Sequence, residues 1–389
     1  MPKSVWLLIV GMVINTVGSS FLWPLNTIYM HNHLGQSLTV AGLVLMANSA
    51  AAIVGNLLGG FLFDRIGGHK TILIGTFLTL IGLLGLTFWH GWPYYVWFLT
   101  FIGFSGGMIF PCMFAMVGAA WPEGGRRGFN AIYLAQNLGV AFGPALAGIV
   151  ANLSFDYIFA ANFLMYVVFF VVAMSYKKIP QGRGMAPTNV VSEGKRIKDK
   201  SSLYALCILG IGFLLGWAVY SQWTTTISTY TQEIGISLTQ YSYLWTINGL
   251  LIVCGQPLIA PIVRKVGDRY QILMVTGVII FMVSFFVLSF AETFTMFVVA
   301  MVILTFGEIF VWPTVPTVVS AFSPPGRDGF YQGLINSFCT TGRMVGPLMG
   351  GLLADHFGMH FTFYMLIAIL AVSIIPYLLY HIPLKKQKI

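Results

Sequence analysis

The chain has 389 residues, of which 57% are hydrophobic, 15% aromatic and only 8% charged, and its mean hydropathy is +0.84. Soluble globular chains carry about 25% charged residues, so this composition offers too little polar surface to face water. It excludes a soluble protein and predicts a chain that crosses a membrane many times. The net charge of +9 has no accompanying base-stacking or groove-reading element, so we expect no nucleic-acid partner.

A helix that spans a bilayer needs about 20 mostly apolar residues. Charged residues and Gly/Pro clusters divide the chain into twelve such stretches, so we predict an all-α membrane protein with twelve transmembrane helices in two six-helix bundles. The stretches cover residues 5–30, 38–63, 71–89, 94–120, 128–153, 158–176, 203–230, 238–263, 271–290, 294–322, 329–354 and 361–380.

The longest polar segment, 177–202, contains Gly, Pro, Asn and seven basic residues, as expected of a solvated linker. It separates a predicted N-terminal bundle, 1–176, from a predicted C-terminal bundle, 203–389. If the N-terminus is cytoplasmic, every Lys and Arg except Arg343 falls at the cytoplasmic side, and Arg343 lies within a span. Cytoplasmic loops of membrane proteins carry such an excess of basic residues, so we expect both termini in the cytoplasm.

The two halves share landmarks. The sequence GRRGF at 125–129 recurs as GRDGF at 326–330, 201 positions later, and each precedes a helix that carries a Gly-Pro pair. A parallel repeat of six spans joined by a basic linker is typical of two-bundle secondary transporters, whose substrate site lies near the bilayer midplane between the bundles.

The paired helices also carry small residues four positions apart. These residues make a groove in which a partner helix can lie closely, and the prolines supply a bend. We therefore predict a helix-packing motif formed by Gly139, Gly143, Pro144, Gly346 and Pro347.

The segment GFLFDRIG at 60–67 resembles the signature of the major facilitator superfamily between its second and third spans, and the whole chain resembles the twelve-span drug:proton antiporters of that superfamily. The basic pair that usually follows is replaced here by Gly68 and His69. The resemblance implies the major facilitator fold and a cytoplasmic gate, in which charged residues latch the bundles. The residues that match this gate are Gly60, Asp64, Arg65 and Gly67. Alternatively, Asp64 only ends a helix and Arg65 only marks the topology.

Glu308 and Arg343 each lie about midway along a predicted span. A charge at the bilayer centre costs about 2.5–3.5 kcal/mol on insertion scales, so it needs a partner or a wet cavity. Our hypothesis is that Glu308 couples transport to protons, with Arg343 or a cationic substrate competing with protonation. The first alternative is a static ion pair between Glu308 and Arg343. In the second, Arg343 binds an anionic group of the substrate and Glu308 neutralises it.

In the fold that the resemblance implies, spans one, four, seven and ten line the substrate cavity. Methionine and aromatic side chains there make an adaptable apolar surface, and amides and hydroxyls supply orienting contacts, which suits lipophilic substrates of variable shape. The predicted cavity residues are Asn15, Asn26, Met108, Met113, Tyr220, Gln222, Trp223 and Trp312.

These observations predict a multi-pass protein of the bacterial plasma (inner) membrane that exports hydrophobic or cationic compounds in exchange for protons by alternating access. The alternative is a proton-coupled carrier for a specific metabolite, glycolipid or siderophore. A non-transporting sensor or a lipid scramblase would not require a central acid. We expect no enzyme activity, cofactor or metal site. The expected partners are a lipophilic substrate, protons and the lipid bilayer, and the protein is expected to be a monomer.

Overall fold

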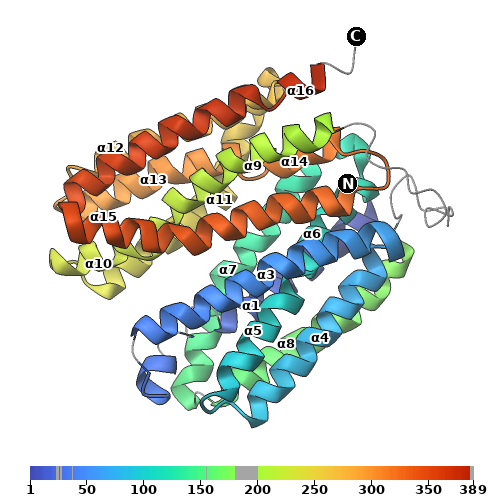
Figure 1. The fold of residues 1–389 in the computed structure, drawn as a ribbon, viewed down its shortest axis with the longest axis horizontal. Coiled ribbons are helices and arrows are strands. Elements are labelled where there is room, and N and C mark those ends of the chain that lie inside the picture. Colours follow the sequence, from blue (N-terminus) through green and yellow to red (C-terminus); the bar gives the residue numbers. More distant parts are fainter. Residues whose placement is uncertain (23–25, 27–28, 37, 155, 180–199, 386–389) are drawn as a thin grey trace. The chain divides into compact units, whose positions relative to one another are not determined.

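The computed structural model describes residues 1–22, 26, 29–36, 38–154, 156–179 and 200–385, and in this part of the chain every regular element is helical (Figure 1). The chain divides into two compact units. Unit 1 contains Met1–Glu193 and Ser323–Ser337, and unit 2 contains Gly194–Phe322 and Phe338–Ile389. Most of the predicted linker, residues 180–199, lies outside the described residues.

The first half of the chain forms long helices separated by short turns. Their bounds are α1 (Lys3–Leu22), the π-helix η1 (Tyr29–His33), α3 (Leu38–Ile66), α4 (Gly68–Phe88), α5 (Tyr94–Gly107), α6 (Ile109–Ala120), η2 (Pro122–Gly124), α7 (Arg126–Leu153), α8 (Asp156–Met174) and η3 (Ser175–Lys178).

The second half of the chain also forms helices separated by short turns. Its helices are α9 (Ser201–Tyr220), η4 (Ser221–Thr224), α10 (Thr226–Glu233), α11 (Leu238–Val266), α12 (Tyr270–Leu288), α13 (Phe294–Val311), α14 (Thr314–Phe322), α15 (Asp328–Leu379) and α16 (Ile382–Lys385). The long α15 contains two helices joined at Gly358, where φ is 79° and ψ is 167°. Glycine adopts a positive φ without a steric penalty, so the chain kinks there.

The predicted spans coincide with these helices. In the described part, nine helices are long and apolar enough to cross a membrane, or ten if α11, which bends by 57° within its length, is counted as one span. The fifth predicted stretch is α7, and the eleventh and twelfth are the two halves of α15 on either side of Gly358. Spans four, seven and ten are each built from consecutive shorter helices. The all-helical fold class is therefore confirmed.

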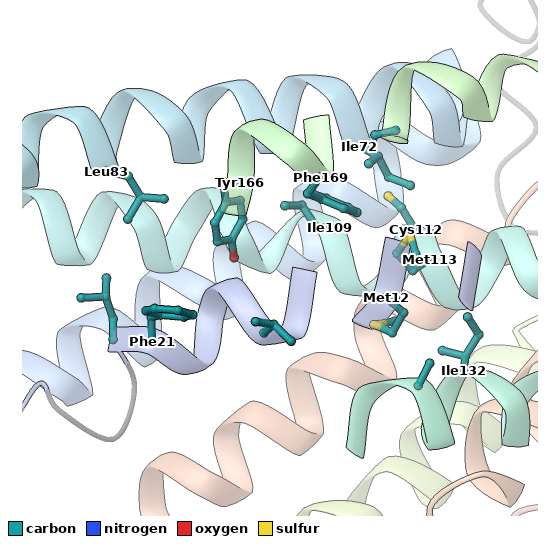
Figure 2. Packing of buried hydrophobic residues seen from close by; sticks show 14 of the residues in the cluster. Met12, Phe21, Ile72, Leu83, Ile109, Cys112, Met113, Ile132, Tyr166 and Phe169 are labelled. Atoms are coloured by element: carbon teal, nitrogen blue, oxygen red, sulfur yellow. The ribbon is translucent and has the colours of Figure 1, made fainter. Parts of the chain in front are cut away.

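Unit 1 has a dense apolar core in which α1 packs against α7 and α8, α3 against α5, and α4 against α8. Figure 2 shows Tyr166 and Phe169 of α8 near Met12 and Phe21 of α1 in this core, and all four are at most 4% exposed. Large apolar side chains also lie on the outside, including Trp97 at 74% exposure. An apolar exterior is what a lipid environment requires.

The predicted packing motif brings helices together in the same way in both units. In unit 1, a Cβ atom at Gly139 of α7 would lie 2.5 Å from Cβ of Thr16 and 2.9 Å from the carbonyl oxygen of Val13, both in α1. Gly143, one turn later, lies against Val17 and Ser20. Pro144 belongs to α7, but its side chain lies outside the described residues.

In unit 2, Gly346 of α15 lies against Ala218 and Ser221 of α9 and η4, and Pro347 follows within the helix. Ala218 and Ser221 occur 201 positions after Val17 and Ser20, so the internal repeat extends from the sequence to the helix contacts. The absence of side chains at these glycines permits the close approach of the two backbones.

Replacing Gly139 by leucine is expected to destabilise the protein, because the new side chain would overlap α1. Overpacking of this kind costs about 1–3 kcal/mol or more, so the apparent melting temperature should fall by several degrees. Gly42→Leu is the control, since a Cβ atom at Gly42 would meet nothing within 4 Å. Thermal unfolding followed by size-exclusion chromatography measures the difference. Equal melting temperatures for the two variants would contradict the tight α1–α7 contact.

Candidate functional site

The carboxyl group of Glu308 is the centre of a polar cluster inside unit 2. Glu308 lies in α13 and is only 2% exposed. The Nδ2 amide of Asn248, in α11, donates a hydrogen bond of 2.6 Å to Oε1 of Glu308. The same amide donates to the hydroxyl of Thr305 at 2.9 Å. Thr305 and Glu308 are three residues apart in one helix, so both side chains face Asn248.

Tyr220, at the end of α9, forms a second hydrogen bond with the Glu308 carboxyl. Two neutral donors from two other helices therefore meet one acid that is buried from solvent. A carboxylate accepts such donors, while a protonated carboxyl adds an O–H donor of its own. The cluster thus offers polar partners to an acid that apolar surroundings alone would not accommodate.

Aromatic rings surround Tyr220. The rings of Trp217 and Trp312 stack with their centroids 4.6 Å apart, and Tyr220 packs edge-on against Trp312 at 5.6 Å. Phe213 and Phe281 also contact Trp312, at 5.5 and 5.4 Å. Offset and edge-to-face contacts of this kind are favourable beyond the area they bury. These rings form one continuous aromatic cluster next to the buried acid.

Arg343 contacts the Trp217 ring of this cluster. Its guanidinium carbon is 5.4 Å from the centre of the Trp217 ring, a cation–π geometry, and its side chain is exposed. Asn248 and Tyr220 contact Glu308, while the Arg343 guanidinium lies over the Trp217 ring. The structure therefore brings both charged side chains to one aromatic cluster.

Asp64, at the end of α3, contacts the start of α15 within unit 1. Its Oδ1 accepts a hydrogen bond of 2.8 Å from the backbone N–H of Gly329, and its Oδ2 accepts one of 2.8 Å from Phe330. These are free N–H groups of the first helical turn, where a negative charge is also favoured by the helix dipole. Asp64 therefore caps a helix, but one 265 residues away in the sequence.

Three other residues of the predicted gate surround this contact. Gly60 lies directly against Gly329, and a Cβ atom at Gly329 would come within 2.5 Å of the Gly60 carbonyl oxygen. Gly67, with φ at 95°, ends α3 and starts α4. Arg65 is exposed and its guanidinium lies 5.4 Å from the Phe61 ring, so the observed contact uses backbone donors and Asp64.

The predicted cavity residues are mostly packed inside the units. Of the eight, only Tyr220 is partly exposed, and the others are at most 5% exposed. Met113 belongs to the apolar core of unit 1, with Met108 next to Gly59 of α3. Asn26 accepts a hydrogen bond of 2.7 Å from Tyr95. Both side-chain polar atoms of Asn15 are buried without a hydrogen-bond partner among the described residues.

In unit 2, the side-chain amide of Gln222 donates hydrogen bonds to the carbonyl oxygens of Ala218, at 2.9 Å, and Gly346, at 2.6 Å. The carbonyl oxygen of Trp223 accepts from the Tyr241 hydroxyl. Gln222 and Trp223 are both fully buried, so in this structure they hold helices together. Of the eight residues, only Tyr220 and Trp312 join the cluster around Glu308, and their contact with substrate stays a prediction.

Sequence reasoning missed Asn248 and Trp217. Asn248 is an amide near the middle of the eighth predicted span, and a polar residue within a span is itself a signal of a buried partner. Its partner is 60 residues away, so only the packing of α11 on α13 reveals the pair.

Comparison with known proteins identifies the family. A profile of the Major Facilitator Superfamily matches residues 8–344 and 208–389. The chain is 53% identical over 389 residues to the MFS-type transporter YttB of Bacillus subtilis, covering 100% of this chain and 98% of that protein. It is 26% identical to the proton-coupled antiporter flippase LtaA of Staphylococcus haemolyticus, covering 91% and 90%. The human organic anion transporter MFSD10 superposes with a TM-score of 0.81 at 15% identity, over 97% and 100% of the two chains. With a family profile across both halves and a 53% identical relative along its whole length, the chain belongs to the major facilitator superfamily of membrane transporters.

Proposed function

We propose that the protein is a proton-coupled antiporter that exports hydrophobic compounds across the bacterial plasma membrane. The observation that carries this proposal is the Glu308 carboxyl, which is 2% exposed inside a membrane-spanning helix and hydrogen-bonded to Asn248 and Tyr220. An ionisable residue inside a membrane protein is expensive and commonly marks a proton path.

Coupling follows from the two states of this carboxyl. When protonated, Glu308 is neutral and its burial is tolerated without a counter-charge. When deprotonated, it depends on the Asn248 and Tyr220 donors and favours a conformation that opens the cluster to water. A ligand shifts a conformational equilibrium only by its differential affinity for the two states. Protonation of Glu308 favours one of the two conformations. Substrate bound at the aromatic cluster next to it favours the other conformation.

Two features support antiport rather than a static scaffold. LtaA, which matches over most of both chains, is described as a proton-coupled antiporter. In addition, Glu308 lies in Thr305-Phe306-Gly307-Glu308, and aligning the two halves at Pro111 and Pro313 places Gly106 opposite it. The acid is therefore an addition that the repeated helix architecture does not need.

A second candidate is a carrier dedicated to one metabolite or lipid with an anionic group. The exposed Arg343 favours it, since a fixed positive charge at that depth selects among substrates more narrowly than apolar rings do. Both candidates use the same proton site, and they differ in the breadth of substrates that are transported.

The test is transport in proteoliposomes that carry a pH step. Neutral, cationic and anionic lipophilic fluorophores, with ethidium as one of the cations, are presented to vesicles with and without the gradient. We expect proton-dependent accumulation of at least one class, and collapse of the gradient by an ionophore should abolish it. Accumulation that is unchanged when the gradient is collapsed would refute proton coupling.

A further inference from the structure

Arg343 places a positive charge at the middle of the first helix in α15. It lies 15 residues after Asp328 and 15 residues before the kink at Gly358. At 1.5 Å per residue, each end of this helix is about 22 Å away, which is longer than an arginine side chain. The guanidinium therefore cannot reach the lipid headgroups by extending along the helix, as basic residues near helix ends do.

Arg343 also points away from the apolar face of its helix. Successive residues of a helix are rotated by about 100°, so Val345, Leu348 and Leu352 project within about 40° of the direction opposite Arg343. These three side chains are 41%, 55% and 51% exposed, as expected of a face in contact with lipid. An exposed arginine on the opposite side must face water or a polar ligand, because lipid would not solvate it.

The two charges of the cluster differ in accessibility. The Glu308 carboxyl is 2% exposed, so a cationic substrate cannot reach it in this structure unless the surrounding side chains move. The Arg343 guanidinium is exposed, and the face of the Trp217 ring is its neighbour. A substrate that enters this side of unit 2 therefore meets a positive charge.

Three polar groups of this region can donate hydrogen bonds that they do not make among the described residues. The indole N–H groups of Trp217 and Trp312 and the hydroxyl of Tyr377 are buried without a hydrogen-bond partner in the described part of the chain. Trp312 and the Tyr377 hydroxyl flank the same glycine, since a Cβ atom at Gly216 would lie 3.7 and 3.8 Å from them. Buried donors are rarely left unpaired in native proteins, so a ligand rich in acceptor oxygens would complete this region.

As a refinement that rests on the function proposed above, we propose that the substrate is an amphipathic organic anion. Its carboxylate or phosphate group binds the exposed Arg343 guanidinium, and its apolar part packs against the partly exposed Trp217 side chain. The planar guanidinium matches the paired oxygens of such groups. This assignment favours the alternative in which Arg343 binds an anionic group over the hydrophobic or cationic compounds that the sequence predicted.

The assignment has an electrical consequence. When an anion leaves in exchange for an entering proton, both movements carry charge in the same sense, so an inside-negative membrane potential drives both. A monovalent cation that leaves in exchange for one proton moves no net charge. Export by this protein should therefore accelerate when a potassium diffusion potential, negative on the cytoplasmic side, is imposed at constant pH.

Binding to the purified protein in phosphatidylcholine nanodiscs provides the direct test. Three probes share a dansyl-dodecyl body and end in a phosphate, an alcohol or a trimethylammonium group. We expect the phosphate probe to bind about tenfold or more tightly than the alcohol, as one charge-assisted pair would give. Arg343→Gln should remove this preference without weakening the alcohol probe, and Arg343→Lys should retain part of it. Arg269→Gln, which removes an exposed arginine between α11 and α12, is the matched control and should change nothing.

Three results would overturn the proposal. The first is tightest binding of the trimethylammonium probe. The second is an equal loss of binding of all three probes in Arg343→Gln, which would indicate a structural role of Arg343. The third is full competition by inorganic phosphate at the probe concentration, which would indicate a simple anion site. The outcome is separable from that of the proposed function. If a pH step drives no probe across proteoliposomes, proton coupling fails, whereas an Arg343-dependent preference for the phosphate probe in nanodiscs still supports the anionic substrate.

Discussion

Replacing Glu308 by glutamine is expected to abolish the response of transport to a pH gradient. Glutamine has the shape of a protonated glutamate and still offers an oxygen to the Asn248 amide, which donates at 2.6 Å in the native protein. It cannot release or take up a proton between pH 5 and 9. The variant should therefore fold and bind substrate, and its gradient-driven accumulation should fall by about tenfold or more, to the level of passive equilibration.

The measurement compares two modes of transport in the same proteoliposomes. Substrate exchange without a gradient requires only the protonated-like state and should persist in Glu308→Gln, while accumulation driven by a pH step should disappear. Glu292→Gln is the matched control, because Glu292 is an exposed acid in the turn before α13 and loses the same charge. If Glu308→Gln keeps its full response to the gradient, another group carries the proton.

Replacing Asp64 by asparagine is expected to loosen the contact between α3 and the start of α15. The carboxylate uses both oxygens, one for the Gly329 N–H and one for the Phe330 N–H, each at 2.8 Å. Asparagine has one acceptor oxygen, and its amide N–H groups would face a backbone donor. A hydrogen bond to a charged group contributes about 1.5–3 kcal/mol, so the arrangement in which α3 contacts the start of α15 should become about 10–100-fold less favoured.

Alkylation of an introduced cysteine measures this change. Ser337 is 5% exposed in unit 1, where its hydroxyl bonds to the carbonyl oxygens of Ile53 and Gly333. In a background without the native cysteines, Ser337→Cys should react faster with a water-soluble maleimide when Asp64→Asn is added, and transport should slow. Asp268→Asn, an exposed acid between α11 and α12, is the control. Unchanged alkylation and transport in Asp64→Asn would show that this contact is not a gate.

The segment predicted to form a gate illustrates how far a sequence motif can be interpreted. The segment at 60–67 predicted that Asp64 and Arg65 act together in a charged latch, and the alternative held that Asp64 only ends a helix. In the structure, Asp64 accepts from backbone N–H groups of α15 while Arg65 lies over Phe61. The aspartate at position 64 indicates that a hydrogen-bond acceptor is needed at the end of α3. The sequence of the start of α15 does not indicate that its backbone N–H groups are the donors, because almost every residue has such a group.

The packing glycines were more predictable for a physical reason. A glycine every fourth residue places one strip without side chains along a helix, whatever the partner is. The sequence therefore indicates that Gly139 and Gly346 face a close neighbour. The identity of that neighbour, α1 in one unit and α9 in the other, depends on the topology of each bundle.

The sequence by itself determined the positions of the apolar helices, the repeat of the two halves and the place of Glu308 and Arg343 about midway along their predicted spans. These properties follow from local composition, because lipid demands about 20 apolar residues per span and penalises each charge within it. Only the tertiary structure decided that Asn248 and Tyr220 bind Glu308, that Arg343 is exposed over Trp217, and that most predicted cavity residues are packed inside the units. Hydrogen bonds and ring contacts join residues that are 60 or more positions apart, and the order of residues along one helix does not encode which other helix it will meet.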